Sequence, residues 1–154
     1  MTIHNLSQLN VLLKPGQRLL GLDLGGKSLG LALSDVSLTV ATPFVVIKRR
    51  NLVKDKKILF QIMHRQNVGG LVVGLPLQMN GMEGSQAVAT LAFVRNLSQQ
   101  VEIALFDERL SSAAVERMLI TEADLSRQRR RQVTDKVAAA YILQGALDFL
   151  KNTA

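Results

Sequence analysis

Apolar residues in the first third of the chain form three short runs separated by turn-forming stretches. The first two runs cover about residues 18–24 and 29–34, and the sequence GGKS (residues 25–28) lies between them. Two short apolar runs around a glycine-rich break are typical of a β-hairpin. The third run, at about residues 40–47, is rich in β-branched residues and contains Pro43, which favours an edge strand or a bulge. The pattern therefore predicts three strands, the first two paired as a hairpin.

The remaining residues change between helical and strand-like periodicity. We predict strands at about residues 68–75 and 101–106, and helices at about residues 52–66, 85–99, 111–120 and 127–150. Leading hairpin strands followed by alternating helices and strands favour an α/β fold. The expected architecture is a five-stranded mixed sheet that begins with the antiparallel hairpin strands and carries helices on both faces.

The chain length of 154 residues fits a single domain, which we place at residues 18–150. Residues 1–17 end in Pro15-Gly16, and we expect them to form a loosely packed N-terminal extension; residues 151–154 form a C-terminal tail. No apolar run reaches the length of a membrane span, the N-terminus lacks the features of a secretory signal, and the chain has no cysteine. We therefore expect a cytoplasmic protein with no membrane partner.

Residues 21–28 also match the phosphate-binding P-loop pattern, GxxxxGKS. A P-loop requires a helix directly after its Lys-Ser pair, because the helix N-terminus faces the phosphates. Here residues 29–34 alternate large and small side chains at period two, which predicts a strand. Asp23 would also place a negative charge near the bound phosphate. The pattern therefore favours a hairpin over a nucleotide site.

Three acidic residues occupy positions that the fold alone does not require. Asp23 lies inside the first strand, Glu108 directly follows the fifth strand, and Asp135 lies near the start of the last helix. Active sites of open α/β sheets gather at strand ends. Three carboxylates there would offer only oxygen ligands, which suit Mg²⁺ or Mn²⁺. Two such ions can activate water and stabilise the leaving oxygen in phosphodiester hydrolysis.

Each of these acids also has a purely structural interpretation. Asp23 could pair with a buried cation, Glu108 could pair with Arg109, and Asp135 could be an acid in the first turns of a helix that is favoured by the helix dipole. Asp107 is a further candidate, because the sequence does not decide which of Asp107 and Glu108 points toward the site.

The formal net charge of +7 favours a polyanionic partner such as nucleic acid. Four arginines gather where the last helix begins, although cations there oppose the helix dipole. This arrangement indicates a gain from an anionic partner, and the alternative is a solvated basic face. The four arginines are Arg127, Arg129, Arg130 and Arg131. A second basic stretch contains Lys48, Arg49, Arg50, Lys54, Lys56 and Lys57.

Four motifs in this order resemble those of the YqgF/RuvX family: GLDLGGKSLGLALSD, VVGLPLQMNGMEG, DERLSS and TDKVAAAYIL. The resemblance covers about residues 18–150. It implies an RNase H-like fold and a metal-dependent nuclease site formed by Asp23, Glu108 and Asp135. The chain departs from the family pattern in the hairpin, where GGKS replaces the common GTKR, and after DERL, where Ser111-Ser112 stand and threonine is common. Residues 1–17 have no counterpart in that pattern.

The resemblance implies a Mg²⁺- or Mn²⁺-dependent nuclease that processes the 5′ end of pre-16S rRNA in ribosome biogenesis. Lys27, Arg109 and the arginines of residues 127–131 are the candidate phosphate ligands. A Holliday junction resolvase acting on branched DNA is the alternative enzyme, and a non-catalytic rRNA-binding assembly factor is the alternative of another class. The chain could act as a monomer or a homodimer, and a dimer would suit symmetric cleavage of a junction.

Overall fold

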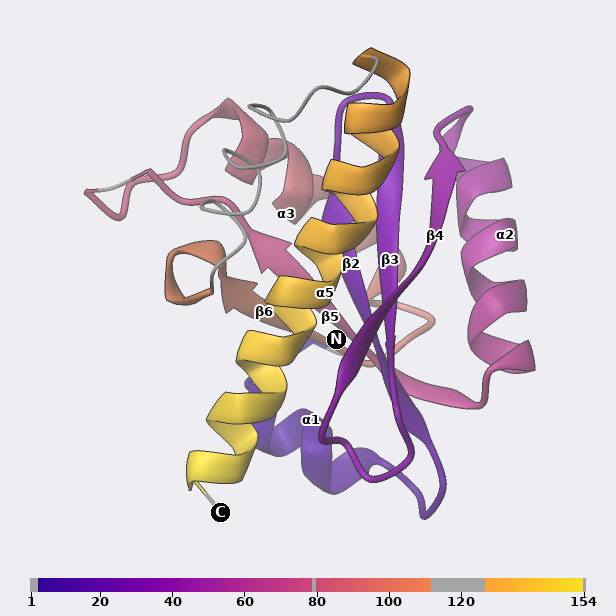
Figure 1. The fold of residues 1–154 in the computed structure, drawn as a ribbon, viewed down its shortest axis with the longest axis vertical. Coiled ribbons are helices and arrows are strands. Elements are labelled where there is room, and N and C mark those ends of the chain that lie inside the picture. Colours follow the sequence, from indigo (N-terminus) through magenta and orange to yellow (C-terminus); the bar gives the residue numbers. More distant parts are fainter. Residues whose placement is uncertain (1–2, 79, 112–126, 154) are drawn as a thin grey trace.

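A six-stranded mixed sheet forms the centre of the described part of the chain (Figure 1). The computed structural model describes residues 3–78, 80–111 and 127–153, and for residues 127–134 and 153 it describes the backbone only. The strands are β1 (Ile3–His4), β2 (Arg18–Leu24), β3 (Ser28–Ser34), β4 (Ala41–Lys48), β5 (Val68–Leu75) and β6 (Ile103–Asp107). Their order in space is β1-β6-β5-β2-β3-β4. Strands β2, β3 and β4 are antiparallel neighbours, whereas β1, β6, β5 and β2 run parallel.

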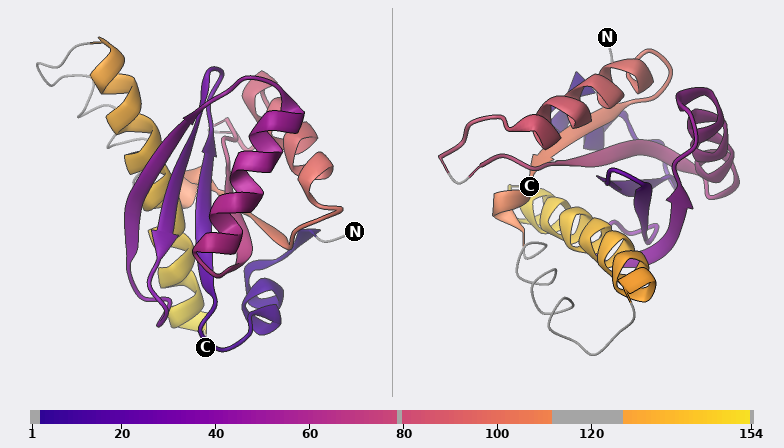
Figure 2. Two further views of the ribbon diagram at one scale, coloured as in Figure 1. Left: turned by 90° about the vertical axis from the view of Figure 1, so that its right-hand side faces the viewer. Right: turned by 90° about the horizontal axis from the view of Figure 1, so that it is seen from above.

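Helices cover both faces of this sheet. Helices α1 (Leu6–Leu12) and α5 (Arg127–Thr153) pack on one face, and helices α2 (Leu52–Arg65) and α3 (Ser85–Leu97) pack on the other. Figure 2 shows the three layers from above, with α5 on one side of the strands and α2 and α3 on the other. A short 3-10 helix, η1 (Glu108–Leu110), follows β6. No helix among the described residues is long and apolar enough to span a membrane.

The predicted α/β fold is confirmed, and a sixth strand is added to it. The hairpin strands β2 and β3 pair antiparallel, and a strand rather than a P-loop helix follows Lys27. Strand β4 lies at the sheet edge with a register shift where Pro43 pairs with Ala32, as the proline indicates. The helix expected at residues 111–120 lies outside the described residues except for Ser111. Helix α5 runs to Thr153, through most of the segment expected to form a tail.

The expectation that residues 1–17 pack loosely is wrong. Strand β1 extends the sheet by pairing in parallel with β6, with Ile3 opposite Ile103. Helix α1 begins with a capping box, in which the Asn5 side chain accepts a hydrogen bond from the Gln8 N–H and the Gln8 side chain accepts one from the Asn5 N–H. Leu9 of this helix is completely buried. The segment is therefore part of the hydrophobic core.

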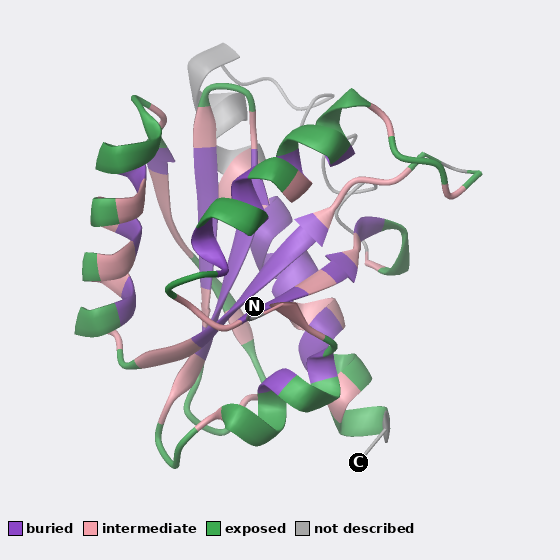
Figure 3. Cartoon of the chain, turned by 180° about the vertical axis from the view of Figure 1, so that it is seen from behind, coloured by how far each residue is buried: buried purple, intermediate pink, exposed green. Residues whose placement is uncertain are grey.

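Side-chain size differs sharply between the two faces of the central strands. Large leucines such as Leu22 and Leu31 point toward α2 and α3, where they join one buried cluster. Small residues such as Gly21, Gly30 and Ala32 alternate with them and point toward α5. Figure 3 shows that the central strands are buried along most of their length. Because the small residues leave room, the backbone of α5 can lie directly on the sheet.

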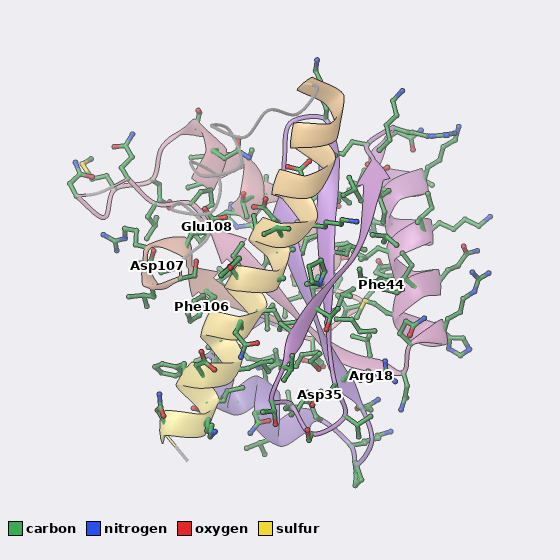
Figure 4. The ribbon with its side chains drawn as sticks, viewed as in Figure 1. Arg18, Asp35, Phe44, Phe106, Asp107 and Glu108 are labelled. Carbon is green, nitrogen blue, oxygen red and sulfur yellow. The ribbon has the colours of Figure 1, made fainter. Side chains whose placement is uncertain are left out.

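The turn between β3 and β4 is organised by Asp35. Its carboxylate accepts hydrogen bonds from the Ser37 hydroxyl at 2.6 Å and from the main-chain N–H groups of Thr39 at 2.8 Å and Val40 at 3.1 Å. These bonds, led by the one from Ser37, lower the pKa of Asp35 to about 2. Figure 4 shows Asp35 near the opposite end of the sheet from Glu108, so this acid serves the turn.

Candidate active site

Asp23 lies near the carboxyl end of β2, between two strands that carry glycine beside it. Its partner on β3 is Gly30. On the other side, Leu22 pairs with Val73 of β5, so Gly74 comes next along that strand. The Asp23 residue is 5% exposed. Since neither flanking glycine has a side chain, the space around the carboxylate is open to groups from other elements.

Helix α5 brings Asp135 to this position through a direct backbone contact. A Cβ atom added to Gly30 would lie only 2.0 Å from the main-chain oxygen of Asp135. Asp135, the first residue of α5 whose side chain is described, therefore lies over Gly30, the residue that pairs with Asp23. The half-buried Asp135 carboxylate accepts a hydrogen bond from the Ser28 hydroxyl at the start of β3. This bond ties the acid of the last helix to the hairpin.

Glu108 enters from the other side of Asp23. It opens η1 directly after β6 and is 8% exposed. A Cβ atom added to Gly74 would lie 3.0 Å from Glu108 Oε1. The Glu108 carboxylate therefore lies over Gly74 of β5, which flanks Asp23. Figure 4 labels Glu108 at the end of β6 where η1 begins. The structure thus brings the three predicted acids to one end of the sheet, on the face covered by α5.

Asp107 has a different role from Glu108. Its carboxylate caps η1 by accepting the Arg109 main-chain N–H at 3.0 Å, and it forms an ion pair with the Arg109 guanidinium, with 2.6 Å between Oδ2 and Nη2. The hydrogen bond from Arg109 lowers the pKa of Asp107, and the same bond raises the pKa of Arg109. The sequence left the choice between the two acids open; Asp107 positions Arg109, an expected phosphate ligand.

Two polar side chains hold the hairpin beside the acids, and the sequence indicated neither of these contacts. The Arg49 guanidinium donates a hydrogen bond to the Gly25 carbonyl at 2.9 Å, and the Arg49 main-chain N–H donates one to the Lys27 carbonyl at 2.9 Å. The Gln86 amide of α3 donates to the Leu24 carbonyl at 2.7 Å. These contacts fix the end of β2 and the turn that carries Lys27. These contacts join residues far apart in the chain, so no local sequence pattern predicts them.

The three acids have the chemistry of metal ligands, but the described part of the structure does not bring them together as a metal site. Among residues 3–78, 80–111 and 127–153, no three His, Cys, Asp or Glu side chains lie close enough together to hold a metal ion. The carboxylates nevertheless offer the oxygen ligands that Mg²⁺ and Mn²⁺ prefer. Asp23 and Glu108 are both more than nine-tenths buried. Their chemistry and burial therefore fit a divalent cation.

The predicted phosphate ligands are only partly placed by the structure. Lys27 lies in the hairpin turn beside Ser28, and Arg109 lies on η1 next to Glu108. The backbone of α5 is helical from Arg127, but the side chains of residues 127–134 are outside the described part of the structure. The proposed phosphate contacts of those four arginines therefore remain predictions.

The fold is RNase H-like and resembles that of RuvC. The chain superimposes on Thermus thermophilus RuvC, solved alone and in complex with a Holliday junction substrate, with a TM-score of 0.52 in both cases. The match to the complex covers 90% of this chain and 98% of that chain, at 16% identity. At this identity the likeness shows a shared fold.

The chain belongs to the RuvX family. The sequence model of that family, described as Holliday junction resolvase, matches residues 17–149. A relative from Rhodospirillum rubrum is 51% identical over 152 residues, covering 97% of this chain and 94% of the relative. A relative from Phenylobacterium zucineum is 45% identical over 155 residues, covering 99% of each chain. Both relatives are named "Putative pre-16S rRNA nuclease".

These comparisons confirm the resemblance. The family model begins at residue 17, so the residues before it have no counterpart in the family pattern, as expected. The alignments to the two relatives nevertheless cover 97% and 99% of this chain and so include most of that segment.

Proposed function

We propose that this chain is a metal-dependent nuclease that cleaves phosphodiester bonds of structured RNA, with the 5′ end of pre-16S rRNA as its substrate. The observation that carries the proposal is the placement of Asp23, Glu108 and Asp135 at one end of the sheet, beside Gly30 and Gly74, with Asp23 and Glu108 buried. The name that both of these relatives carry supports the substrate.

In this proposal Asp23, Glu108 and Asp135 hold the metal. When bound, Mg²⁺ or Mn²⁺ supplies an activated water and charge stabilisation for the leaving oxygen. Asp23 is held on a central strand that is paired on both sides, so its main chain is rigid. The Ser28 hydroxyl orients the Asp135 carboxylate through the hydrogen bond between them.

The basic residues around the acids bind the substrate in this proposal. Lys27 is carried by a turn whose carbonyl groups are held by Arg49, so its amino group projects from a fixed backbone. Arg109 is oriented by its ion pair with Asp107. The arginines at residues 127–131 add positive charge at the described beginning of α5, and the net charge of +7 attracts the polyanion over longer distances.

The decisive experiment compares cleavage of a labelled pre-16S rRNA 5′ fragment by the wild-type chain and by Asp23→Asn, in Mg²⁺, Mn²⁺ or EDTA. We expect metal-dependent cleavage that the substitution abolishes, while binding of the RNA persists. The matched control is Asp148→Asn, the same substitution on an exposed part of α5. Cleavage that survives both EDTA and Asp23→Asn would disprove the proposed site. Tight RNA binding without cleavage by the wild-type chain would favour an assembly factor.

A Holliday junction is the second candidate substrate. The family model is described as Holliday junction resolvase, and the matched RuvC structure contains such a junction. A four-way DNA junction should therefore be tested beside the RNA under the same conditions. Junction cleavage without RNA cleavage would reassign the substrate and keep the chemistry. Symmetric nicking would require two active sites, so sedimentation of the active species as a dimer would accompany that result.

A further inference from the structure

A groove lies between α2 and the C-terminal end of α3, on the sheet face opposite the three acids. Its volume is about 780 Å³, within the range of sites that hold ligands or anchoring side chains. Leu52, Val53 and Phe60 of α2 supply its apolar lining, and Asn96 of α3 lies at its other wall. Figure 3 shows α2 and α3 on the side away from α5. The groove is therefore separate from the proposed active site.

The apolar side chains of helix α2 extend from the sheet to the edge of the groove. Leu59 and Met63 are buried against the strands. Phe60 is partly buried against the same cluster and also lines the groove, where Leu52 is 36% exposed and Val53 is 78% exposed. The outward face of a surface helix is ordinarily polar. Exposed apolar side chains that gather in a groove mark an interaction site.

The charge around the groove has one sign. Lys56, Lys57 and Arg65 line it together with His64, and no acidic residue belongs to the described lining. An occupant with apolar groups for the floor and carboxylates for the rim would match both properties. A second copy of this chain in a symmetric dimer would place one set of cations against another. Single-stranded RNA would use several aromatic stacking platforms, and the described lining offers only the rings of Phe60 and His64.

We propose that this groove binds an acidic amphipathic helix of a protein partner. The apolar side of such a helix would lie on Leu52, Val53 and Phe60, and its acidic flanks would face Lys56, Lys57 and Arg65. The 14 residues of α2 provide a wall of about 21 Å, enough for roughly four turns of a partner helix. The proposal does not depend on the nuclease chemistry, because the two surfaces lie on opposite faces of the sheet.

The test uses a fluorescein-labelled synthetic peptide of sixteen residues, roughly four helical turns, with leucine at positions i, i+3, i+4 and i+7 and glutamate at most others. Fluorescence anisotropy follows its titration with the full chain. We expect saturable binding that weakens as salt is raised. The double variant Lys56→Glu and Lys57→Glu should bind at least about tenfold more weakly, because like charges then face each other. Val53→Glu should weaken binding as well.

The matched control carries the same double charge reversal outside the groove, at the exposed Lys14 and Lys151. It should bind the peptide like the wild-type chain, and all variants should keep the wild-type Tm. Equal binding by the groove variant and the control, binding of a lysine-for-glutamate peptide, or no saturable binding would overturn the proposal. Competition by a twelve-nucleotide oligouridine would assign the groove to RNA. A wild-type dimer that Val53→Glu dissociates would assign it to self-association.

Discussion

The contact between α5 and β3 makes Gly30 the most informative single position in the fold. In Gly30→Ala, the new Cβ would lie 2.0 Å from the Asp135 carbonyl oxygen and 2.4 Å from its carbonyl carbon. Contacts of Cβ atoms below 3.0 Å are essentially absent from proteins, and both neighbours here are backbone atoms. The 2.0 Å contact is about 1 Å shorter than that 3.0 Å limit, so helix α5 must move away from the sheet by at least about 1 Å at Asp135.

The size of the effect follows from that displacement. Overpacking of this kind costs about 1–3 kcal/mol. Replacing a strand glycine by alanine returns about 0.5–1 kcal/mol of backbone entropy, so we expect a net loss of up to about 2.5 kcal/mol, with a midpoint of roughly 1 kcal/mol. For a chain of this size, that loss lowers Tm by a few degrees, which differential scanning calorimetry measures. Cleavage should fall about 100-fold, because a shift of about 1 Å in a catalytic group has that order of effect.

Gly26→Ala is the matched control for stability. A Cβ atom at Gly26 would have no neighbour within 4 Å, so the same substitution should leave Tm unchanged. Gly30→Ala with the Tm of Gly26→Ala and the wild-type cleavage rate would refute the inference that α5 rests on this glycine.

Three further predictions concern other parts of the fold. Leu9→Ala should lower the free energy of unfolding by about 2–5 kcal/mol in denaturant titrations, whereas Val11→Ala, at a side chain that is 81% exposed, should have little effect; equal values would exclude α1 from the core. Arg49→Ala loses a hydrogen bond to the hairpin and the packing of its guanidinium over the Phe93 ring, whose centroid lies 5.8 Å from Cζ. This variant should lower the free energy of unfolding by about 1–2 kcal/mol and raise the KM for RNA, whereas Arg50→Ala should change neither. The pKa of Asp35, lowered to about 2, means that its stabilisation is complete above about pH 4 and is lost as the pH falls through 2. Asp35→Asn should therefore have a lower Tm than wild type at pH 6, and a constant difference down to pH 2 would contradict this.

Most of the sheet could be predicted from the sequence because period-two patterns are local. The runs at residues 18–24 and 68–75 coincide with β2 and β5 as observed. Strand β1 was missed because two residues show no period, and its partner β6 lies about 100 positions away. The burial of α1 was missed for the same reason: Leu9 packs against residues brought together only by the fold.

The acids of the candidate site were predictable for a different reason. A carboxylate inside an apolar strand, as at Asp23, conflicts with its surroundings, and the conflict is visible in the sequence. The groups that position the acids were not visible. Ser28 and Asp135 meet across the whole chain, and Gly30 is notable only once α5 is seen to lie on it. The sequence likewise did not show which of Asp107 and Glu108 points toward the site, because that depends on where η1 begins.

The order of the strands has a consequence for the time at which the protein becomes active. Asp23 belongs to the first hairpin to be synthesised, whereas Asp135 belongs to the last helix. Strand β1 can pair only after β6 has been synthesised. Chains emerge from the ribosome N-terminus first, at about 5–20 residues per second. A nascent chain therefore carries the first acid of the proposed site for several seconds without the last. If the proposed function is correct, a nascent chain that has not yet folded Asp135 into its helix should be unable to cleave RNA, because one of the three proposed metal ligands is missing.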